Sequence, residues 1–360
     1  MAKRVAFFLP DMRLGGAERV ALTLIAYFVD HGIDVDLLLM EATGELLVDV
    51  PESVRVIDLK APRIRRALTG LVSYLRRERP DALQVSMWPL TVVGIIAGKL
   101  ARTHTRVVVS EHVVLSEQYG GSARTMAAMR ATLRLFFPLA AARICVSAGV
   151  VDDVAGLSGL PSRRFDLVYN PIGAPDHIVT SAAVDSQWGG EGPRILTVGS
   201  LKIQKNQALL LDAFARLPDN QARLTILGDG PLRAELEHRV AELDLVGRVA
   251  MPGFTNDPWP YYASADLFVL SSDYEGFGNV IVEAMHAGLP IVSTDCSSGP
   301  AEILANGEYG DLVPVGDGEA LAGAIQFSLS RPPSPDRQKL RAGDFSVEAA
   351  ASRYLSLLLG

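Results

Sequence analysis

The sequence predicts an α/β protein with two Rossmann-like domains, each a doubly wound parallel sheet. Three observations lead to this class. The chain has 360 residues, which is too long for one ordinary hydrophobic core. In both halves, short apolar runs are followed by a glycine turn and a helical pattern, as in buried parallel strands joined by crossover helices. Periodicity fades at residues 173–193, which are rich in Gly, Pro, Ser and Asp, so we expect the interdomain linker there.

The composition is that of a folded soluble protein, with 49% hydrophobic and 21% charged residues. No apolar run reaches the ~18 residues that a membrane-spanning helix needs. The apolar part of the N-terminus is too short for a signal peptide, so we expect a cytoplasmic protein. The two cysteines, Cys145 and Cys296, fit a reducing compartment and predict neither a disulfide framework nor a metal site. We expect both to be small buried side chains.

The net charge of −7 is unevenly distributed, because basic residues outnumber acidic ones up to Gly173 and the reverse holds afterwards. The basic residues gather at 60–66, at 76–79, and along Arg124, Arg130 and Arg134. Such helices can lie peripherally on an anionic membrane surface, here the inner face of the cytoplasmic membrane, or meet a phosphate-bearing acceptor. Solvated helix faces are the alternative. Nucleic acid is not an expected partner, because the whole chain is acidic and lacks an aromatic-interleaved basic patch.

The first domain, residues 1–172, opens with a strand at Val5–Leu9. Gly15 and Gly16 then precede a helix from Ala17 to His31, and a second strand follows at Val35–Met40. A glycine turn between strand and helix suits a phosphate group. Because it is not a G-x-G-x-x-G fingerprint, dinucleotide binding receives little support.

Two acidic patterns in this domain are not assigned to metal binding. Asp34 and Asp36 have the D-x-D form used by metal-dependent sugar transferases, but they enter an apolar strand with no third ligand in view. Asp152 and Asp153 lie on a predicted helix after Ser147, where carboxylates suit the positive end of the helix dipole.

A histidine marks the carboxyl end of another predicted strand. Strand patterns continue at residues 83–86, 106–110, 144–147 and 165–168, and the second of these leads into His112. Ligands of open α/β sheets bind at the carboxyl ends of the strands. His112 can there hydrogen-bond a ligand hydroxyl or stabilise negative charge on a bound phosphate, whereas a purely structural role is the alternative.

The second domain, residues 194–344, begins with a strand at Arg194–Val198 and a helix from Gln207 to Leu217. Lys202 and Lys205 lie where this strand gives way to the helix, so their ammonium groups can help to neutralise a diphosphate. Further strands are predicted at 224–227 and 248–254. A helix at 319–329, a Pro-rich turn at 332–335 and an amphipathic helix at 345–360 complete the chain.

The stretch 265–295 organises the predicted site. It contains a strand at Leu267–Leu270, a turn with Gly276 and Gly278, and a short helix from Asn279 that Gly288 terminates. The first turn of this helix has free N–H groups that suit a diphosphate. Glu275 and Glu283 flank that position, and each carboxylate can accept two hydroxyl hydrogen bonds.

Two glutamates at this spacing, in the words Glu-Gly-Phe-Gly-Asn and Glu-Ala-Met-His-Ala-Gly-Leu-Pro, resemble the E-x7-E motif of retaining GT-B glycosyltransferases of family 4. The resemblance covers nearly the whole chain and implies two domains facing a central cleft, with the last helix crossing back to the first domain. It implies that Glu275 holds donor-sugar hydroxyls and Glu283 the ribose. The glycine loop at Gly15 would lie near donor phosphates, and the loop ending at Phe254 would frame the base.

One position departs from the family pattern. The family commonly has Gly-Arg-Leu with a Lys five residues after the Arg, whereas this chain has Ser200 at the Arg position and keeps Lys205. Lys202 is our candidate for the missing charge, although an ammonium lacks the bidentate geometry of a guanidinium.

The resemblance therefore implies a hexosyltransferase of cell-envelope polysaccharide biosynthesis. The expected donor is a UDP-sugar, with GDP left open, and the expected acceptor is a glycan or a polyprenyl-diphosphate-linked saccharide. Retention is implied by the family, and neither a metal nor a cofactor is expected. We predict Glu275, His112 and Lys205 as catalytic residues. The predicted donor-binding residues are Gly15, Gly16, Lys202, Lys205, Phe254, Glu275, Gly276, Phe277, Gly278, Asn279, Val280 and Glu283.

Two alternatives remain. A non-hydrolysing UDP-sugar epimerase shares the two-domain plan, and a catalytically silent regulator would bind a nucleotide sugar without turning it over. Intact Glu275, Glu283 and Lys205 argue against the regulator.

Overall fold

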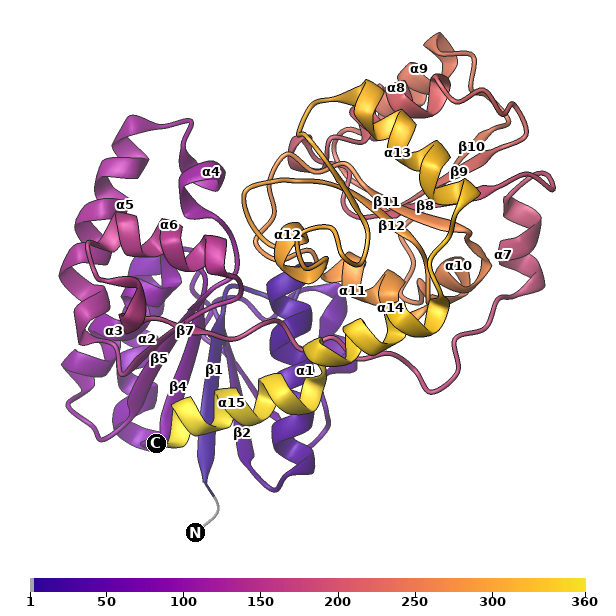
Figure 1. The fold of residues 1–360 in the computed structure, drawn as a ribbon. Helices are drawn as coiled ribbons and strands as arrows, with labels where there is room; N and C mark the ends of the chain where they lie inside the picture. Colours follow the sequence, from indigo (N-terminus) through magenta and orange to yellow (C-terminus); the bar gives the residue numbers. More distant parts are fainter. Residues whose placement is uncertain (1–2) are drawn as a thin grey trace. The chain divides into compact units, whose positions relative to one another are not determined.

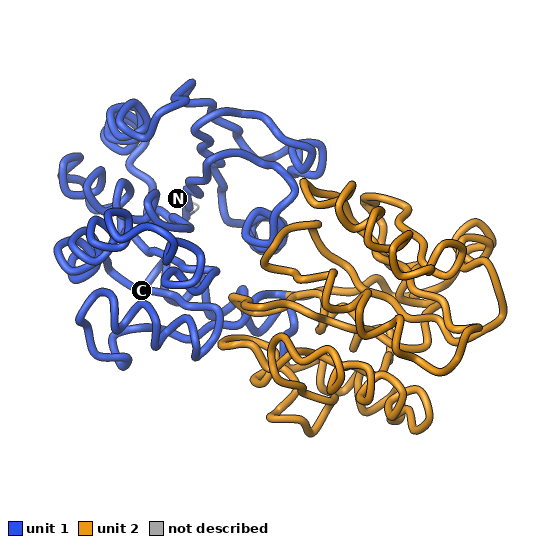
Figure 2. The backbone as a smooth tube through the Cα atoms, turned by 90° about the horizontal axis from the view of Figure 1, so that it is seen from above, with its two compact units in different colours: residues 1–171, 345–360 blue, residues 172–344 orange. Residues whose placement is uncertain are grey.

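The structure is a computed structural model that describes residues 3–360. Figure 1 shows the elements in chain order, and Figure 2 shows that they form two compact units. Unit 1 consists of Met1–Pro171 with Phe345–Gly360, and unit 2 is Ile172–Asp344. The last helix of the chain therefore belongs to the unit that contains the N-terminal half.

Unit 1 is built on a seven-stranded sheet in which all neighbouring strands are parallel. The sheet order is β3-β2-β1-β4-β5-β6-β7. The chain adds β2 and β3 on one side of β1, then β4 to β7 on the other, which makes the sheet doubly wound. The strands are β1 Arg4–Leu9, β2 Asp34–Leu39, β3 Arg55–Asp58, β4 Ala82–Ser86, β5 Arg106–Glu111, β6 Ala142–Cys145 and β7 Asp166–Leu167.

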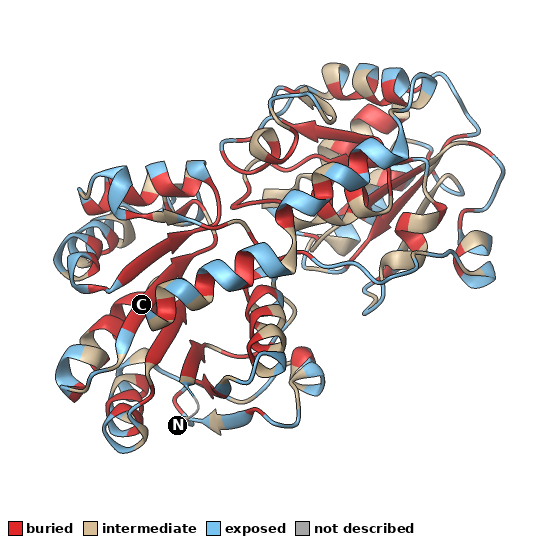
Figure 3. Ribbon diagram, turned by 60° about the horizontal axis from the view of Figure 1, so that its bottom comes forward, coloured by how far each residue is buried: buried red, intermediate tan, exposed pale blue. Residues whose placement is uncertain are grey.

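Helices cover both faces of this sheet (Figure 1). Helices α1 and α15 share one hydrophobic core with β1 and β2, and Tyr354 and Leu358 of α15 are fully buried in it. Figure 3 shows buried strands and helices with one exposed side, as expected for amphipathic helices on a sheet. The helices are α1 Gly16–Asp30, α2 Ile64–Glu78, α3 Leu90–Ala101, α4 Leu115–Tyr119, α5 Ala123–Phe136, α6 Ala148–Ser158 and α15 Val347–Leu359.

Unit 2 repeats the same plan with a six-stranded parallel sheet in the order β10-β9-β8-β11-β12-β13. Its strands are β8 Arg194–Val198, β9 Arg223–Leu227, β10 Val249–Gly253, β11 Leu267–Leu270, β12 Ile291–Thr294 and β13 Asp311–Val313. Its helices are α7 Ala182–Gln187, α8 Gln207–Ala215, α9 Arg233–Glu242, α10 Trp259–Ser264, α11 Asn279–His286, α12 Pro300–Ile303, α13 Gly318–Ser330 and α14 Pro335–Ala342.

The predicted fold class is confirmed, since both halves are doubly wound parallel sheets. The segment 173–193, predicted as a linker, contains α7, which begins after the cap residue Ser181. The indole of Trp188 at the end of α7 is buried and donates a hydrogen bond to Ser264. The Pro-rich turn predicted at 332–335 leads at once into α14, which has Pro335 as its first residue. Proline suits this position because its missing N–H would be unpaired there anyway.

Both cysteines are buried free thiols, as predicted. Within residues 3–360, no helix combines the length and the apolar character required to cross a membrane.

Candidate functional site

The predicted site of unit 2 lies at the position in the sheet where the chain stops adding strands on one side of β8 and begins to add them on the other side. Strands β8 and β11 are neighbours, although β9 and β10 intervene in the chain. Lys205 follows β8 and Glu275 follows β11, so both lie beyond the carboxyl ends of adjacent parallel strands. This is the switch point at which open α/β sheets bind their ligands.

Lys205 and Glu275 form an ion pair across this switch point. The Lys205 ammonium lies 2.5 Å from Glu275 Oε1, and the Ser272 hydroxyl donates to the same oxygen at 2.6 Å. Both side chains are largely buried, with 17% and 7% of their surface exposed. A carboxylate in such surroundings needs these donors, because an unpaired buried charge is costly. Lys205 and Glu275 were predicted from the sequence, whereas Ser272, three residues before Glu275, was not.

Further hydrogen bonds connect the loops that carry this pair. The Gln204 amide donates to Tyr274 O at 2.8 Å, and the Ser271 hydroxyl donates to Lys205 O at 2.9 Å. Asn206 adopts a left-handed conformation, with φ of 43°. Its side chain donates to Asp273 Oδ1 at 2.7 Å and accepts from Leu209 N at the start of α8. The pair is therefore held by two loops that are tied to each other.

The turn between Glu275 and α11 is closely packed. Phe277 and Gly278 are buried, and Gly278 adopts a positive φ of 101° directly before α11. The Ser298 hydroxyl donates to Gly276 O at 3.0 Å. A Cβ on Gly299 would come within 1.8 Å of Phe277 O, so only glycine allows this approach. Asn279 and Val280 are half-buried, which leaves the first turn of α11 partly accessible.

Glu283 lies one turn further along α11. Its Oε2 accepts a 2.7 Å hydrogen bond from the hydroxyl of Tyr262, whose ring is completely buried on α10. The Glu283 side chain itself is half-buried. Tyr262 was not predicted as a site residue, because nothing in the pattern Trp-Pro-Tyr-Tyr indicates a partner on another helix.

The remaining predicted residues of unit 2 are more exposed. Lys202 is exposed at the start of the short 3-10 helix Ile203–Lys205. Ser200, which stands where the family commonly has Arg, accepts a 3.2 Å hydrogen bond from the Gln207 side chain through its backbone carbonyl. Phe254 follows β10 with 44% of its surface exposed.

In unit 1, Gly15 and Gly16 form the turn from β1 into α1. Gly15 is the cap residue of α1 and Gly16 its first residue. A Cβ on Gly15 would come within 2.0 Å of Glu18 Oε2, so the Glu18 carboxylate lies against Gly15. An acidic side chain in the first turn also stabilises the positive end of the helix dipole.

His112 follows β5 and is 9% exposed. Its Nε2 lies 2.9 Å from Ser110 Oγ. Burial lowers the pKa of His112 to about 4, and a hydrogen bond to Asn170 opposes this shift. The imidazole is therefore neutral at physiological pH.

Glu111, next to His112, is fully enclosed. Its two carboxylate oxygens accept hydrogen bonds from Trp88 N at 3.0 Å and Thr91 Oγ1 at 2.9 Å. Burial raises the pKa of Glu111 to about 7, which outweighs the lowering effect of these donors.

The D-x-D pattern has a structural explanation. Asp36 is buried and accepts two hydrogen bonds from the Arg55 guanidinium and one from the Tyr74 hydroxyl. Among residues 3–360, no group of three or more His, Cys, Asp or Glu is placed to hold a metal ion.

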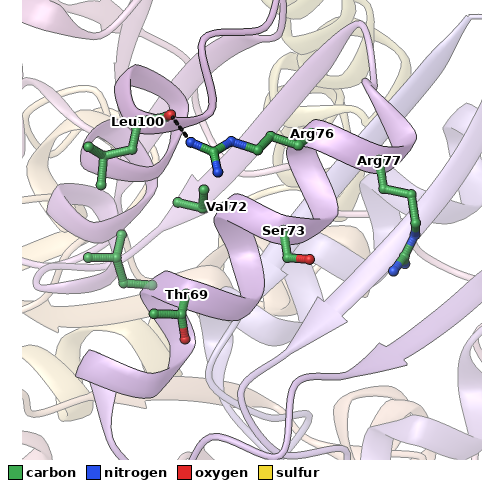
Figure 4. Close-up of a pocket in the computed structure, with 7 residues that line it drawn as sticks. Thr69, Val72, Ser73, Arg76, Arg77 and Leu100 are labelled. Carbon is green, nitrogen blue, oxygen red and sulfur yellow. Dashed lines mark hydrogen bonds between the residues drawn. The ribbon is translucent and has the colours of Figure 1, made fainter.

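The structure thus brings Lys205, Glu275 and the start of α11 together in unit 2, while Gly15, Gly16 and His112 belong to unit 1. None of the predicted site residues lines the hollow of about 630 Å³ between α2 and α3 (Figure 4). Arg76 and Arg77 line that hollow beside Val72 and Leu100, and the Arg76 guanidinium donates to Leu100 O at 2.9 Å.

Two family patterns match consecutive parts of the chain. Residues 14–173 match Glycosyltransferase Family 4, and residues 181–343 match Glycosyl transferases group 1.

Several proteins are similar to this chain over nearly its full length. One is the N-acetylgalactosamine-N,N'-diacetylbacillosaminyl-diphospho-undecaprenol 4-alpha-N-acetylgalactosaminyltransferase of Campylobacter jejuni, at 28% identity over 99% of this chain and 100% of the relative. Another is the lipopolysaccharide core biosynthesis glycosyltransferase LpsE of Rhizobium meliloti, at 29% identity over 96% of each chain. Among solved structures, Anabaena HepE in complex with UDP superposes with a TM-score of 0.80 at 22% identity, covering 99% of both chains.

Proposed function

The chain belongs to the GT-B glycosyltransferases, with a Family 4 domain followed by a group 1 domain, and from this premise we propose its reaction. It transfers a sugar from a nucleotide-diphosphate donor, with a UDP-sugar favoured, to a glycan or a polyprenyl-diphosphate-linked saccharide. The anomeric configuration is retained. The observation that carries this proposal is the Lys205–Glu275 pair at the switch point of the second sheet, directly before the helix α11.

The departing diphosphate is stabilised by cations and by backbone N–H groups. Lys205 and Lys202 supply the positive charge, and the turn from Gly276 to Val280 supplies the start of α11. Donors that are already in place when charge develops on a leaving group lower the barrier, because little reorganisation is needed. Lys205 has a second task in this proposal, since its contact with Glu275 Oε1 orients that carboxylate. We propose that these groups act without a metal ion.

The sugar and the nucleoside are held by the two glutamates. Glu275 accepts hydrogen bonds from hydroxyls of the transferred sugar, and Glu283 accepts them from the ribose. Phe254 lies beside the base, and Gly15 and Gly16 allow close approach of the donor phosphates. His112 makes a hydrogen bond within the same complex. Retention rests on the resemblance to the family.

The choice of substrates is supported by the relatives. HepE is described in complexes with UDP and with UDP-glucose. The Campylobacter relative is named as acting on a saccharide linked to diphospho-undecaprenol, and LpsE as a lipopolysaccharide core enzyme. We propose for this chain an acceptor of the same general kind, a lipid-linked or cell-envelope glycan.

Such an acceptor would bring the enzyme to a membrane, and the basic helix α2 is the proposed contact. Arg63, Arg65 and Arg66 are all exposed at its start, and Arg76 and Arg77 are exposed near its end. Exposed arginines next to apolar side chains favour anionic lipid surfaces. Replacing Arg63, Arg65 and Arg66 together by Ser should reduce sedimentation with anionic vesicles while leaving sedimentation with neutral vesicles unchanged. Equal binding to anionic vesicles would remove this part of the proposal.

The reaction is tested by incubating the full chain with a panel of UDP-sugars and a lipid-diphosphate saccharide, followed by mass spectrometry of the lipid product. We expect one sugar to be added and UDP to be released only when acceptor is present. Conversion of the sugar nucleotide without acceptor would indicate the epimerase alternative. Nucleotide binding without any turnover would indicate the regulator. The Glu275→Ala variant should bind UDP but transfer no sugar.

A further inference from the structure

Helix α14 packs against α11, the helix whose start forms the proposed diphosphate site (Figure 1). At the beginning of α14, Pro335 lies against Gly288, since a Cβ on Gly288 would come within 2.8 Å of Pro335 Cβ. Gly288 lies just beyond the end of α11. Near the other end of α14, Arg341 contacts α12. Helix α14 therefore links the end of α11 to α12.

The Arg341 guanidinium binds the last two carbonyl groups of α12. Its Nε donates to Ile303 O at 2.8 Å, and one terminal nitrogen donates to Glu302 O at 2.6 Å. Glu302 O also accepts a longer hydrogen bond, 3.3 Å, from Ala305 N. The last carbonyl groups of a helix have no partners within the helix itself, so an arginine side chain is well suited to bind them.

Helix α12 depends on such contacts because it is a single turn, Pro300–Ile303. A helix this short has little stability of its own, since its first hydrogen-bonded turn costs more conformational entropy than it returns. Its position is therefore set by its neighbours in unit 2. Arg341 holds its end, and at its start the missing side chain of Gly299 allows close approach to Phe277 O.

The buried side of α12 touches the residue that begins α11. Ile303 is completely buried, and its Cδ1 lies 3.7 Å from the position of a Cβ on Gly278, an ordinary packing distance. Gly278 is the cap residue of α11, so its conformation decides where the first N–H groups of that helix point. The contacts thus run from Arg341 through Ile303 to the start of the proposed diphosphate site.

Arg341 is not placed to bring its own charge to a ligand. Its third guanidinium nitrogen donates to Asp344 at 2.8 Å, its guanidinium lies 5.5 Å from the centre of the Tyr309 ring, and only 20% of the side chain is exposed. Arg337, one turn earlier on α14, lies 4.9 Å from the same ring and pairs with Glu308. Within residues 3–360, however, Arg337 makes no hydrogen bond to the backbone of α12.

We propose that Arg341 is a positioning residue for the donor diphosphate. By binding the last carbonyl groups of α12, it holds Ile303 against Gly278 and so keeps the N–H groups at the start of α11 in place for the phosphates. This inference rests on the proposed function. It predicts that Arg341 affects the binding of the diphosphate and leaves the binding of the nucleoside nearly unchanged.

The test compares UDP with uridine, measured by ligand-observed NMR competition on the full chain. We expect the wild type to bind UDP roughly 100-fold more tightly than uridine. In Arg341→Leu this preference should fall roughly tenfold, while the Kd for uridine changes less than about twofold. Arg341→Lys keeps a charged donor without the fork of a guanidinium, and its preference should fall only about threefold. The matched control, Arg337→Leu, should keep the wild-type preference because it removes only the ring contact and an exposed ion pair.

The outcomes separate the positioning role from a general packing role. An unchanged preference for UDP in Arg341→Leu, or equal weakening of UDP and uridine, would overturn the proposal. An equal loss in Arg337→Leu would assign the effect to the packing of Tyr309 and would overturn it too. If Arg341→Leu does not fold, the ratio measured for Arg341→Lys decides. A wild type that binds uridine as tightly as UDP would refute the proposed function itself, so the two failures can be told apart.

Discussion

The ammonium of Lys205 lies 2.5 Å from Glu275 Oε1, and this contact joins the loops that follow β8 and β11. The two residues are 70 positions apart in the chain. They meet because the second sheet adds strands on both sides of β8, so β11 becomes its neighbour. The topology of the sheet thus places the ammonium and the carboxylate side by side, and we propose that the first serves the diphosphate and the second the sugar.

Breaking this pair should affect both stability and activity. Lys205→Met leaves the Glu275 carboxylate buried with Ser272 as its remaining side-chain donor, and we expect a loss of about 3 kcal/mol in the free energy of unfolding. Transfer should fall at least about 100-fold. Urea denaturation and a UDP-release assay measure the two effects.

The double variant Lys205→Met/Glu275→Gln separates the effect on stability from the effect on sugar transfer. A neutral Gln no longer needs a counter-charge, so most of the stability should return while transfer stays low. If the double variant is no more stable than Lys205→Met, the unpaired charge is not the cause of the loss.

Tyr262→Phe tests whether the Tyr262 hydroxyl orients Glu283 toward the ribose. Because this hydroxyl donates to Glu283 Oε2, its removal should raise the Kd for UDP roughly tenfold. The Kd for 2′,3′-dideoxy-UDP should change much less, since that ligand lacks both ribose hydroxyls that Glu283 is proposed to bind. Calorimetric titration with both ligands measures the ratio. Equal weakening of both would indicate a general packing defect.

Gly299→Ala should displace the turn before α11. The added methyl would meet Phe277 O at 1.8 Å, and Phe277 lies between Glu275 and α11. We expect at least about tenfold weaker UDP binding, together with a loss of about 1–3 kcal/mol in stability. Gly307→Ala is the matched control, since Gly307 has a similar φ of 96° but a Cβ there meets nothing closer than 3.8 Å. It should cost only the backbone strain, about 1 kcal/mol, and leave UDP binding intact. Equal effects of the two variants on UDP binding would contradict the role of the Phe277 contact.

The buried Glu111 predicts a specific pH dependence. Its pKa is raised to about 7 in the folded chain, whereas in the unfolded chain it is near the ordinary 4.5. Between these values the unfolded state binds fewer protons, so the free energy of unfolding falls as pH rises, by at most roughly 3 kcal/mol. His112 acts in the opposite sense, because its lowered pKa removes stability as pH falls from about 6.5 toward 4.

The Glu111→Gln variant isolates the pH dependence that Glu111 causes, since His112 contributes equally to the stability of the wild type and of the variant. We expect the stability of the variant relative to wild type to increase by about 2–3 kcal/mol between pH 5 and pH 8. Gln can still accept from Trp88 N and donate to Thr91 Oγ1. Urea denaturation at the two pH values measures the difference, with the exposed Glu52→Gln as the control variant. A constant difference across this range would mean that Glu111 is already ionised in the folded chain at pH 5.

Much of the fold could be predicted because buried parallel strands leave a clear sequence pattern. The runs at β1, β8 and β11 are continuous apolar segments with glycine turns after them. The strand β3 was missed, since Arg55–Asp58 pairs on one side only and keeps largely exposed side chains. The helix α3 was not predicted, because most of its residues are buried and no polar face marks the helical period.

The spacing of candidate site residues can be seen in the sequence where they are close in the chain, whereas the contacts that they make through the sheet cannot. Glu275, Gly278 and Glu283 lie in one loop and helix, so their spacing is visible. The contact of Lys205 with Glu275 depends on β8 and β11 being neighbours in the sheet, and that of Tyr262 with Glu283 depends on how α10 meets α11. Such relationships have no signal in a single sequence.

The central claim is that a nucleotide diphosphate rests against the start of α11 between Glu275 and Glu283. A crystal structure of the full chain with UDP measures this most directly. We expect phosphate oxygens within hydrogen-bond distance of Lys205 or of the N–H groups at residues 278–280, and the ribose hydroxyls against Glu283. UDP bound with its ribose away from Glu283 and its phosphates away from α11 would contradict the account.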